Sequence, residues 1–542
     1  MRRCTYLITI GLGVFSKAIL VTIGYHNSAF YIKYNVVDKL VTHLKIFRKY
    51  YILFYLHYGA ILLSSDQESN SIPSHSFSMK FYTCAIVLAS CVVAIAKTVH
   101  VDVAVIGGGS SGIHAAINLK DAGARVAVIE KKDQIGGHAE TYINPKTKVP
   151  ANIGVVLFEN TKTVQKYLSR LGVATARHNP FNATRPTKMY DFTLGVSVPA
   201  QNELEAAATK EAMAVAMQTY SENVLSKYQW IDQGYHVPDP VPQELLLPFG
   251  QFAQQNNFSA ILPLISQLNW YPGNITTIPT LYGIKKFGPG LLQAVSGEFL
   301  VAASGDTRSI YKAASAVLGK DTYLNSELVR VRRNKEGAVV TIRQKRKTFS
   351  INAKKLVVAV PQTMENMKAF DLSKTERNLF SKFSGFGYVA GIVDIPGLDV
   401  SLQNVGIMTP AKNPMIPGSN AYVYSGSPNQ FLLGVAFGNT DYTVADSTIL
   451  VRKELTTLAR VGAVPIDTAK RVTFPYITNH VPYDLHVNVE EIAKGFYTEL
   501  LELEGSLNTY WTGAAFAGHN SGLIWKWHDG TVLPALKKDL GL

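Results

Sequence analysis

The chain has 542 residues, a net charge of +14 and only three cysteines. Because Cys4, Cys84 and Cys91 all precede residue 97, disulfides are excluded as a stabilising element of the remaining chain. Residues 1–96 carry a net charge of +6, and the +8 left for the remaining chain is a modest excess. No nucleic-acid-binding motif accompanies it, so we expect a solvated basic surface and no nucleic-acid partner.

The first hundred residues contain a targeting signal. Residues 79–96, MKFYTCAIVLASCVVAIA, combine a lysine, an apolar run and a small-x-small ending, which predicts a signal peptide and a secreted, extracellular protein. Met79 is then expected to be the start of translation, and residues 1–78 a gene-model extension or a disordered segment. The alternative is a membrane anchor at 6–25, although Lys17 in its middle would be costly in lipid. A membrane partner is expected only in that case.

A nucleotide-binding pattern begins directly after this region. Residues 101–106 are short, apolar and β-branched, which predicts a buried parallel strand. Three glycines follow at the GxGxxG spacing: Gly107, Gly109 and Gly112. They permit the tight turn, the close approach of a pyrophosphate and the packing of a helix predicted over 113–122. Ser110 and Ser111, at the phosphate-facing end of that helix, join the expected cofactor-binding residues. The alternative is a tight turn in another doubly wound protein.

The next strand carries an acid. Residues 125–129 lead to Glu130, whose carboxylate can accept hydrogen bonds from ribose hydroxyls, and Lys131 follows it. This arrangement favours FAD or NAD over NADP. A second pair of glycines comes shortly after, in the run Gly136, Gly137 and His138.

The paired glycines resemble the motif of the flavin-containing amine oxidase superfamily, FAD/NAD(P)-binding Rossmann type, in which the chain folds back over the FAD pyrophosphate. That superfamily usually has arginine where this chain has His138. The resemblance spans about 100–540 and is nearest to the fungal β-cyclopiazonate dehydrogenase-like group. It implies FAD as the cofactor, Leu328 and Val329 near the adenine, and Gly154 and Val155 near the flavin ring. At the C-terminus it implies flavin contacts from Gly513, Ser521, Gly522 and Leu523.

The roughly 445 residues after the signal are too many for one ordinary core, so two domains are expected. The expected fold class is α/β: a doubly wound, discontinuous FAD-binding domain with an inserted α+β substrate domain. The first would comprise 97–160, 320–365 and 505–542, and the second 161–319 and 366–504. The first insertion is predicted to be helical, with a helix running from 288 to 303, and the second to consist of strands.

The candidate site residues leave the chemistry partly open. Tyr271, Tyr282, Tyr422 and Tyr424 are candidates for a substrate pocket, with ordinary core packing as the alternative. His480 and His486 are candidates for a covalent bond to the flavin; the alternative is a non-covalent cofactor. For His519 and His528 we expect surface or capping roles. No metal site is expected, because neither a CxxC nor an HExxH motif occurs.

The resemblance implies hydride transfer from a carbon next to nitrogen to the flavin, with no particular catalytic residue indicated. Many amine oxidases carry a lysine on a strand that corresponds to 383–395, which has none; the nearest is Lys382. We therefore expect a dehydrogenase or oxidocyclase rather than a plain amine oxidase. Sequons at Asn182, Asn257 and Asn274 fit a secreted glycoprotein.

The leading hypothesis is a secreted FAD-dependent oxidoreductase of an amine-containing or alkaloid-like small molecule. Two alternatives stay open. One is a desaturase or protoporphyrinogen oxidase-like dehydrogenase of an apolar substrate, and the other is a flavin-binding protein without turnover.

Overall fold

The structure is a computed structural model that describes residues 3–12, 15–26, 29–37, 53–56, 59–62, 98–182 and 185–542. The chain divides into two units, 1–94 and 95–542. In the first unit, β1 (Arg3–Leu12), β2 (Phe15–His26) and β3 (Ala29–Val37) form an antiparallel sheet, and β4 (Leu53–Leu56) pairs with β5 (Gly59–Leu62). The predicted signal peptide lies outside the described residues. Among the residues described, no helix has the length and apolar character needed to cross a membrane.

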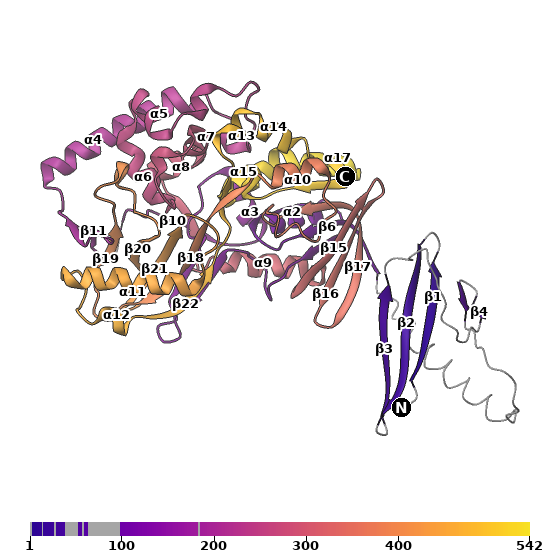
Figure 1. Ribbon diagram of the computed structural model, residues 1–542. Coiled ribbons are helices and arrows are strands. Elements are labelled where there is room, and N and C mark those ends of the chain that lie inside the picture. Colours follow the sequence, from indigo (N-terminus) through magenta and orange to yellow (C-terminus); the bar gives the residue numbers. More distant parts are fainter. Residues whose placement is uncertain are drawn as a thin grey trace, which may run out of the picture. The chain divides into compact units, whose positions relative to one another are not determined.

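The first sheet of the second unit is built around parallel strands. Its order is β14 (Thr322–Tyr323), β7 (Val126–Ile129), β6 (Thr98–Ile106), β17 (Lys347–Val358), β16 (Gly337–Gln344) and β15 (Ser326–Asn334), with β24 (Thr509–Trp511) also beside β17. The pairs among β14, β7, β6, β17 and β24 are parallel, whereas β15, β16 and β17 are antiparallel. Helix α2 (Ser110–Asp121) connects β6 to β7. This confirms the doubly wound α/β fold (Figure 1).

The second sheet of this unit lies between helices. Its order is β12 (Val196–Val198), β11 (Thr187–Asp191), β19 (Ser401–Asn404), β20 (Gly418–Tyr424), β21 (Gln430–Phe437), β18 (Ser384–Asp394) and β22 (Thr473–Asn479), and β23 (Tyr483–His486) also pairs with β18. Helix α11 (Val444–Arg460) buries Val451, Leu455 and Leu458 in a core shared with these strands. Near the other face lie α4 (Glu203–Tyr220), α5 (Phe249–Gln255), α6 (Leu262–Leu268), α7 (Thr280–Lys285) and α8 (Pro289–Ser296) (Figure 1).

One predicted helix is shorter than expected. The helix that we expected over 288–303 ends at Ser296, and β13 (Phe299–Ala302) follows. β13 pairs with β10 (Thr175–His178). Gly297 interrupts the helix, and the run FLVA after it is rich in residues that favour strands.

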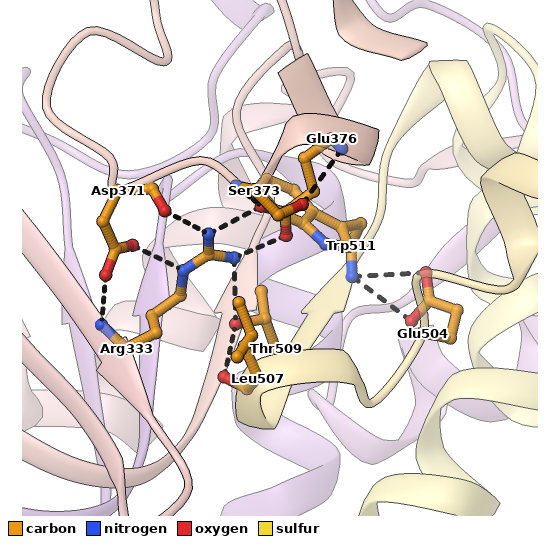
Figure 2. A network of polar contacts seen from close by, with 8 residues as sticks. All are labelled: Arg333, Asp371, Ser373, Glu376, Glu504, Leu507, Thr509 and Trp511. Carbon is orange, nitrogen blue, oxygen red and sulfur yellow. Dashed lines mark hydrogen bonds and ion pairs between the residues drawn. The ribbon is translucent and has the colours of Figure 1, made fainter. Parts of the chain in front are cut away.

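A buried ionic network ties two strands of the first sheet to a neighbouring helix (Figure 2). The Arg333 side chain on β15 is fully buried, and its Nη1 and Nη2 atoms donate to the two carboxylate oxygens of Glu376 at 2.7 and 2.8 Å. Its Nε donates to Asp371 at 2.8 Å, and Nη1 also approaches Thr509 on β24. Glu376 in addition accepts from the backbone N–H of Ser373, at the start of α10 (Lys374–Phe380). One guanidinium therefore joins β15, α10 and β24.

Candidate functional site

The first glycine motif forms the turn from β6 into α2. Gly107 has φ +107°, and a Cβ there would lie 2.9 Å from the Ala359 carbonyl oxygen. A Cβ on Gly112 would lie 2.0 Å from the Gly107 carbonyl oxygen, so the fold itself requires both glycines. Gly109 differs. Its φ is −78°, and a Cβ there would make an ordinary van der Waals contact of 3.7 Å with the Gly137 Cα. Neither the dihedral angles nor the packing therefore requires glycine at position 109. The close approach of a cofactor diphosphate to the backbone would explain it.

The paired glycines pack directly against this turn. The Gly136 N–H donates to the Gly108 carbonyl at 2.7 Å, and a Cβ on Gly137 would lie 2.9 Å from the Gly109 Cα. Two C-terminal residues reach the same region, because Ser110 Oγ donates to Ser521 Oγ at 2.9 Å. Ser111 Oγ donates to Thr512 at 3.0 Å, one residue before Gly513. The structure thus brings together the site residues that the sequence predicts at opposite ends of the chain.

Glu130 holds the turn through hydrogen bonds and can still accept hydrogen bonds from a ligand. Its buried carboxylate accepts from the backbone N–H groups of Gly108 and Lys132, each at 2.7 Å. Each carboxylate oxygen has a second lone pair, which is what ribose hydroxyls would need. Lys131 beside it is exposed. On β15, the register shifts between Leu328 and Arg330, which leaves Val329 outside the ladder near the predicted adenine position.

A cationic side chain beside the paired glycines comes from another segment. Arg308, at the start of α9 (Arg308–Leu318), donates from Nη1 to the carbonyls of Ile135 and Ala139. A Cβ on Gly136 would lie 2.1 Å from that Nη1 atom. His138 is in a different environment: its ring stacks on His480 at 4.3 Å, and burial holds its pKa well below the usual value. Arg308, which sequence reasoning missed, therefore provides a positive charge at the glycine turn.

Gly154, one of the predicted flavin-ring residues, packs against a pair of histidines, His138 and His480. Gly154 has φ +80°, and a Cβ there would lie 2.2 Å from the His138 carbonyl and 2.7 Å from His480 Cε1. Val155 follows it and is half-buried. The His480 Nε2 atom is buried, has no hydrogen-bond partner among the described residues, and lies 3.9 Å from a Glu140 carboxylate oxygen. A covalent bond between the flavin and His480 or His486 stays a prediction.

A cavity of about 460 Å³ opens beside the C-terminal site residues. Its wall includes the segments 484–490 and 518–520 together with Leu523. Of the four predicted tyrosines, Tyr271 and Tyr282 line it. The other two do not line it: Tyr422 stacks on Phe192 in the core of the second sheet at 5.1 Å, as the alternative of core packing expects, and the Arg185 guanidinium lies over the Tyr424 ring. Tyrosines that pack in a core and tyrosines that line a pocket look alike in a sequence.

Of the remaining histidines, two line the cavity and one is buried away from it. His486 and His519 line the cavity, and His519 Nδ1 accepts from the Asp484 N–H at 3.2 Å. His528 is fully buried instead of lying at the surface, with its Nδ1 atom 3.0 Å from that of His114. Burial lowers the pKa of His528 to about 3, so it packs as a neutral ring.

Charged side chains that the sequence did not single out also reach the cavity. Lys286 pairs with Asp484 at 2.7 Å, and Glu159, Asp232 and Lys285 also line the cavity. These residues come from separate segments and have no motif spacing. Lys382, the lysine nearest to β18, instead pairs with Glu491 at 2.7 Å.

The chain is similar to known flavin-dependent oxidoreductases. The model of the flavin containing amine oxidoreductase family matches residues 110–389. The FAD-dependent oxidoreductase dpchF of Colletotrichum higginsianum is 50% identical, covering 84% of this chain and 98% of that protein. The β-cyclopiazonate dehydrogenase of Aspergillus flavus is 32% identical, covering 80% of this chain and 92% of that protein. A solved fatty acid isomerase from P. acnes is similar in fold, with a TM-score of 0.64 and 19% identity, covering 80% of this chain and 98% of its own.

Proposed function

Because the chain belongs to the flavin-containing amine oxidoreductase family and is an FAD-dependent oxidoreductase, we propose that its substrate is a small amine-containing or alkaloid-like molecule. The substrate would be oxidised by loss of a hydride to the flavin. The cavity of about 460 Å³ beside 518–520 and Leu523 is the observation that supports this proposal. Bound FAD supplies the hydride acceptor, and the protein supplies binding and orientation.

The cavity wall suits a ring-containing molecule. Tyr235, Tyr271, Tyr282 and Phe386 contribute aromatic surface that can bind flat apolar groups and exclude water. The Tyr282 hydroxyl is fixed by the Val487 backbone and by Tyr497 Oη at 2.8 Å, which keeps this part of the wall rigid. A rigid aromatic wall favours orientation of one substrate carbon toward the flavin.

An anaerobic panel tests the substrate class. The purified, FAD-loaded protein would be mixed without oxygen with cyclohexylamine, putrescine, an indole alkaloid and an amine-free saturated fatty acid. Bleaching of the flavin by an amine or the alkaloid supports the proposal. Bleaching by the fatty acid alone favours the apolar-substrate alternative, and no bleaching by any compound counts against turnover.

The electron acceptor is part of the same proposal. Residues 383–395 contain no lysine, and Lys382 is held by Glu491. We therefore favour a dehydrogenase over a plain amine oxidase. Reoxidation of the reduced flavin by air at the speed of a typical oxidase would contradict this.

Replacing Arg308 by alanine is expected to weaken FAD binding. The change removes a positive charge beside the paired glycines and releases the carbonyls of Ile135 and Ala139. Hydrogen bonds to charged groups contribute roughly 1.5–3 kcal/mol, so we expect a loss of affinity of at least about tenfold. Flavin fluorescence titration of the apoprotein measures it. Lys312→Ala, one turn further along α9 and paired with Asp306, is the control, and equal affinities for both variants would contradict the assignment.

The proposal includes secretion of a protein that begins at Lys97. The signal-like run 79–96 supports it, as do the sequons at Asn182 and Asn257, both on exposed residues. Asn274 fits less well, because its side-chain oxygen accepts hydrogen bonds from Thr276. N-terminal sequencing of protein from the medium of a secretory host would contradict the proposal if it began within residues 1–78.

A further inference from the structure

A cluster of buried charged groups lies in the cavity wall next to the predicted flavin residues. Glu159, Asp232 and Lys285 are each less than a tenth exposed, and all three line the cavity. Burying ionisable groups is costly, so such a cluster in a cavity wall points to a chemical role rather than to stability.

Two carboxyl groups converge at this place. A Cβ on Gly290 would lie 2.7 Å from Glu159 Oε2 and 3.3 Å from Asp232 Oδ2. A Cβ on Gly522 would lie 3.2 Å from the same Glu159 oxygen. The absence of side chains at the two glycines thus leaves room for the carboxyls. Because Gly522 is itself one of the residues expected at the flavin, Glu159 lies next to the expected flavin site.

The contacts of each acid differ. Glu159 Oε1 accepts from the Asn520 amide at 3.2 Å, and Oε2 lies against the two glycines. Asp232 Oδ2 accepts from the Gly290 N–H at 2.9 Å and lies 3.8 Å from Lys526 Nζ. Asp232 Oδ1 is buried and has no hydrogen-bond partner among the described residues. Glu159 is therefore the less restrained carboxyl of the two.

Lys285 is held in a different way. Its Nζ donates to the carbonyls of Ile231 and Gly234 and lies 4.8 Å from the centre of the Tyr235 ring. Burial lowers the pKa of Lys285 to about 7. Burial and the Asp232 charge raise the pKa of Glu159 to about 8, against the opposing effects of Lys526, Lys285 and Asn520. The cluster can therefore exchange a proton near neutral pH.

From this geometry we infer that Glu159 is the catalytic base for the proposed reaction, with Asp232 and Lys285 as the neighbours that set its charge. The inference rests on the proposed function. The substrate's N–H or O–H bond breaks, its proton passes to a Glu159 carboxylate oxygen, and its electron pair forms the new double bond to carbon. The adjacent C–H bond breaks, and its hydrogen leaves with the electron pair as a hydride that bound, oxidised FAD would accept.

The test follows proton transfer in two ways on the FAD-loaded enzyme. With the compound that bleaches the flavin fastest in the anaerobic panel, the rate of reduction in stopped flow should rise with pH, with a midpoint near 8, because the base works only when ionised. Glu159→Gln should lower the rate at high pH by about a hundredfold or more and remove the rise. Infrared difference spectra between acid and alkaline pH should show a carboxyl band with the same midpoint, absent from Glu159→Gln.

Two further variants keep the result interpretable. Glu454→Gln removes another buried carboxyl, which is hydrogen-bonded to Ser419 and Tyr422 and does not line the cavity, and it should leave the midpoint of flavin reduction unchanged. If Lys285→Met removes the pH dependence and Glu159→Gln does not, the inference is overturned. Flavin reduction with an unaltered profile in Glu159→Gln would also overturn it while leaving the proposed function intact. If no compound bleaches the flavin, the proposed function fails, and the infrared band alone decides whether Glu159 titrates.

Discussion

Gly109→Val is expected to yield a folded protein that binds no FAD. The backbone at Gly109 has ordinary dihedral angles, and a Cβ there would meet only the Gly137 Cα, at 3.7 Å. The protein can therefore accommodate a side chain at 109, whereas a diphosphate that must approach this backbone cannot. The same change at Gly107 or Gly112 would collide with backbone atoms and would test folding instead.

Absorbance of the purified protein measures the flavin content, and circular dichroism measures folding. Gly530→Val is the control, because a Cβ at Gly530 meets no atom within 4 Å. It should purify with its full flavin content. A yellow Gly109→Val protein with stoichiometric FAD would show that the cofactor does not lie on this turn.

Arg333→Met should cause the largest loss of stability. The substitution leaves the buried carboxylate of Glu376 without its bidentate partner and releases Asp371 (Figure 2). Removing one partner of a buried ion pair costs about 3–5 kcal/mol, a large fraction of a typical free energy of unfolding. The loss should appear as a lower midpoint of urea denaturation at saturating FAD.

A matched pair on the neighbouring strand provides the control. Arg343 on β16 also makes a two-pronged contact with an acid, Glu327, but both side chains are about half exposed or more. Exposed pairs contribute little, so Arg343→Met should hardly change the midpoint. Equal losses in both variants would contradict the role given to the Arg333 network. Partial recovery is expected when Glu376→Leu is added to Arg333→Met, because the unpaired charge is then gone.

The cofactor turn could be predicted because its signals are local. Gly107, Gly109 and Gly112 are fixed by the spacing that a strand–turn–helix unit demands, and Glu130 follows at the end of the next strand. Prediction from local sequence fails where a helix-forming segment contains a residue that ends the helix. The helix expected over 288–303 ends at Ser296, since Gly297 and the strand-forming run after it favour pairing with β10.

The cavity wall could not be predicted, because it is assembled from distant segments. Glu159 follows β9 (Pro150–Gly154), Asp232 lies in the short helical turn Ile231–Gln233 and Lys285 ends α7, and the three have no recognisable spacing. Arg308, which donates to the Ile135 carbonyl beside the paired glycines, comes from a helix far along the chain. Residue type alone does not distinguish Tyr422 from Tyr282, but Tyr422 packs in the core of the second sheet. Side-chain direction and tertiary contact, rather than residue type, decide these cases.

The most direct test of the account is anaerobic reduction of the flavin in a variant whose cavity is filled. Ile278 lines the cavity and is only half-buried, so Ile278→Trp should occupy that space and leave the glycine turn intact. We expect Ile278→Trp to purify with a full complement of FAD and to be reduced by the panel compound about a hundredfold more slowly than the unmodified protein, a loss of roughly 3 kcal/mol in transition-state stabilisation. Reduction at the unmodified rate, with the tryptophan in place and FAD bound, would show that the substrate reaches the flavin by another route and would contradict the account.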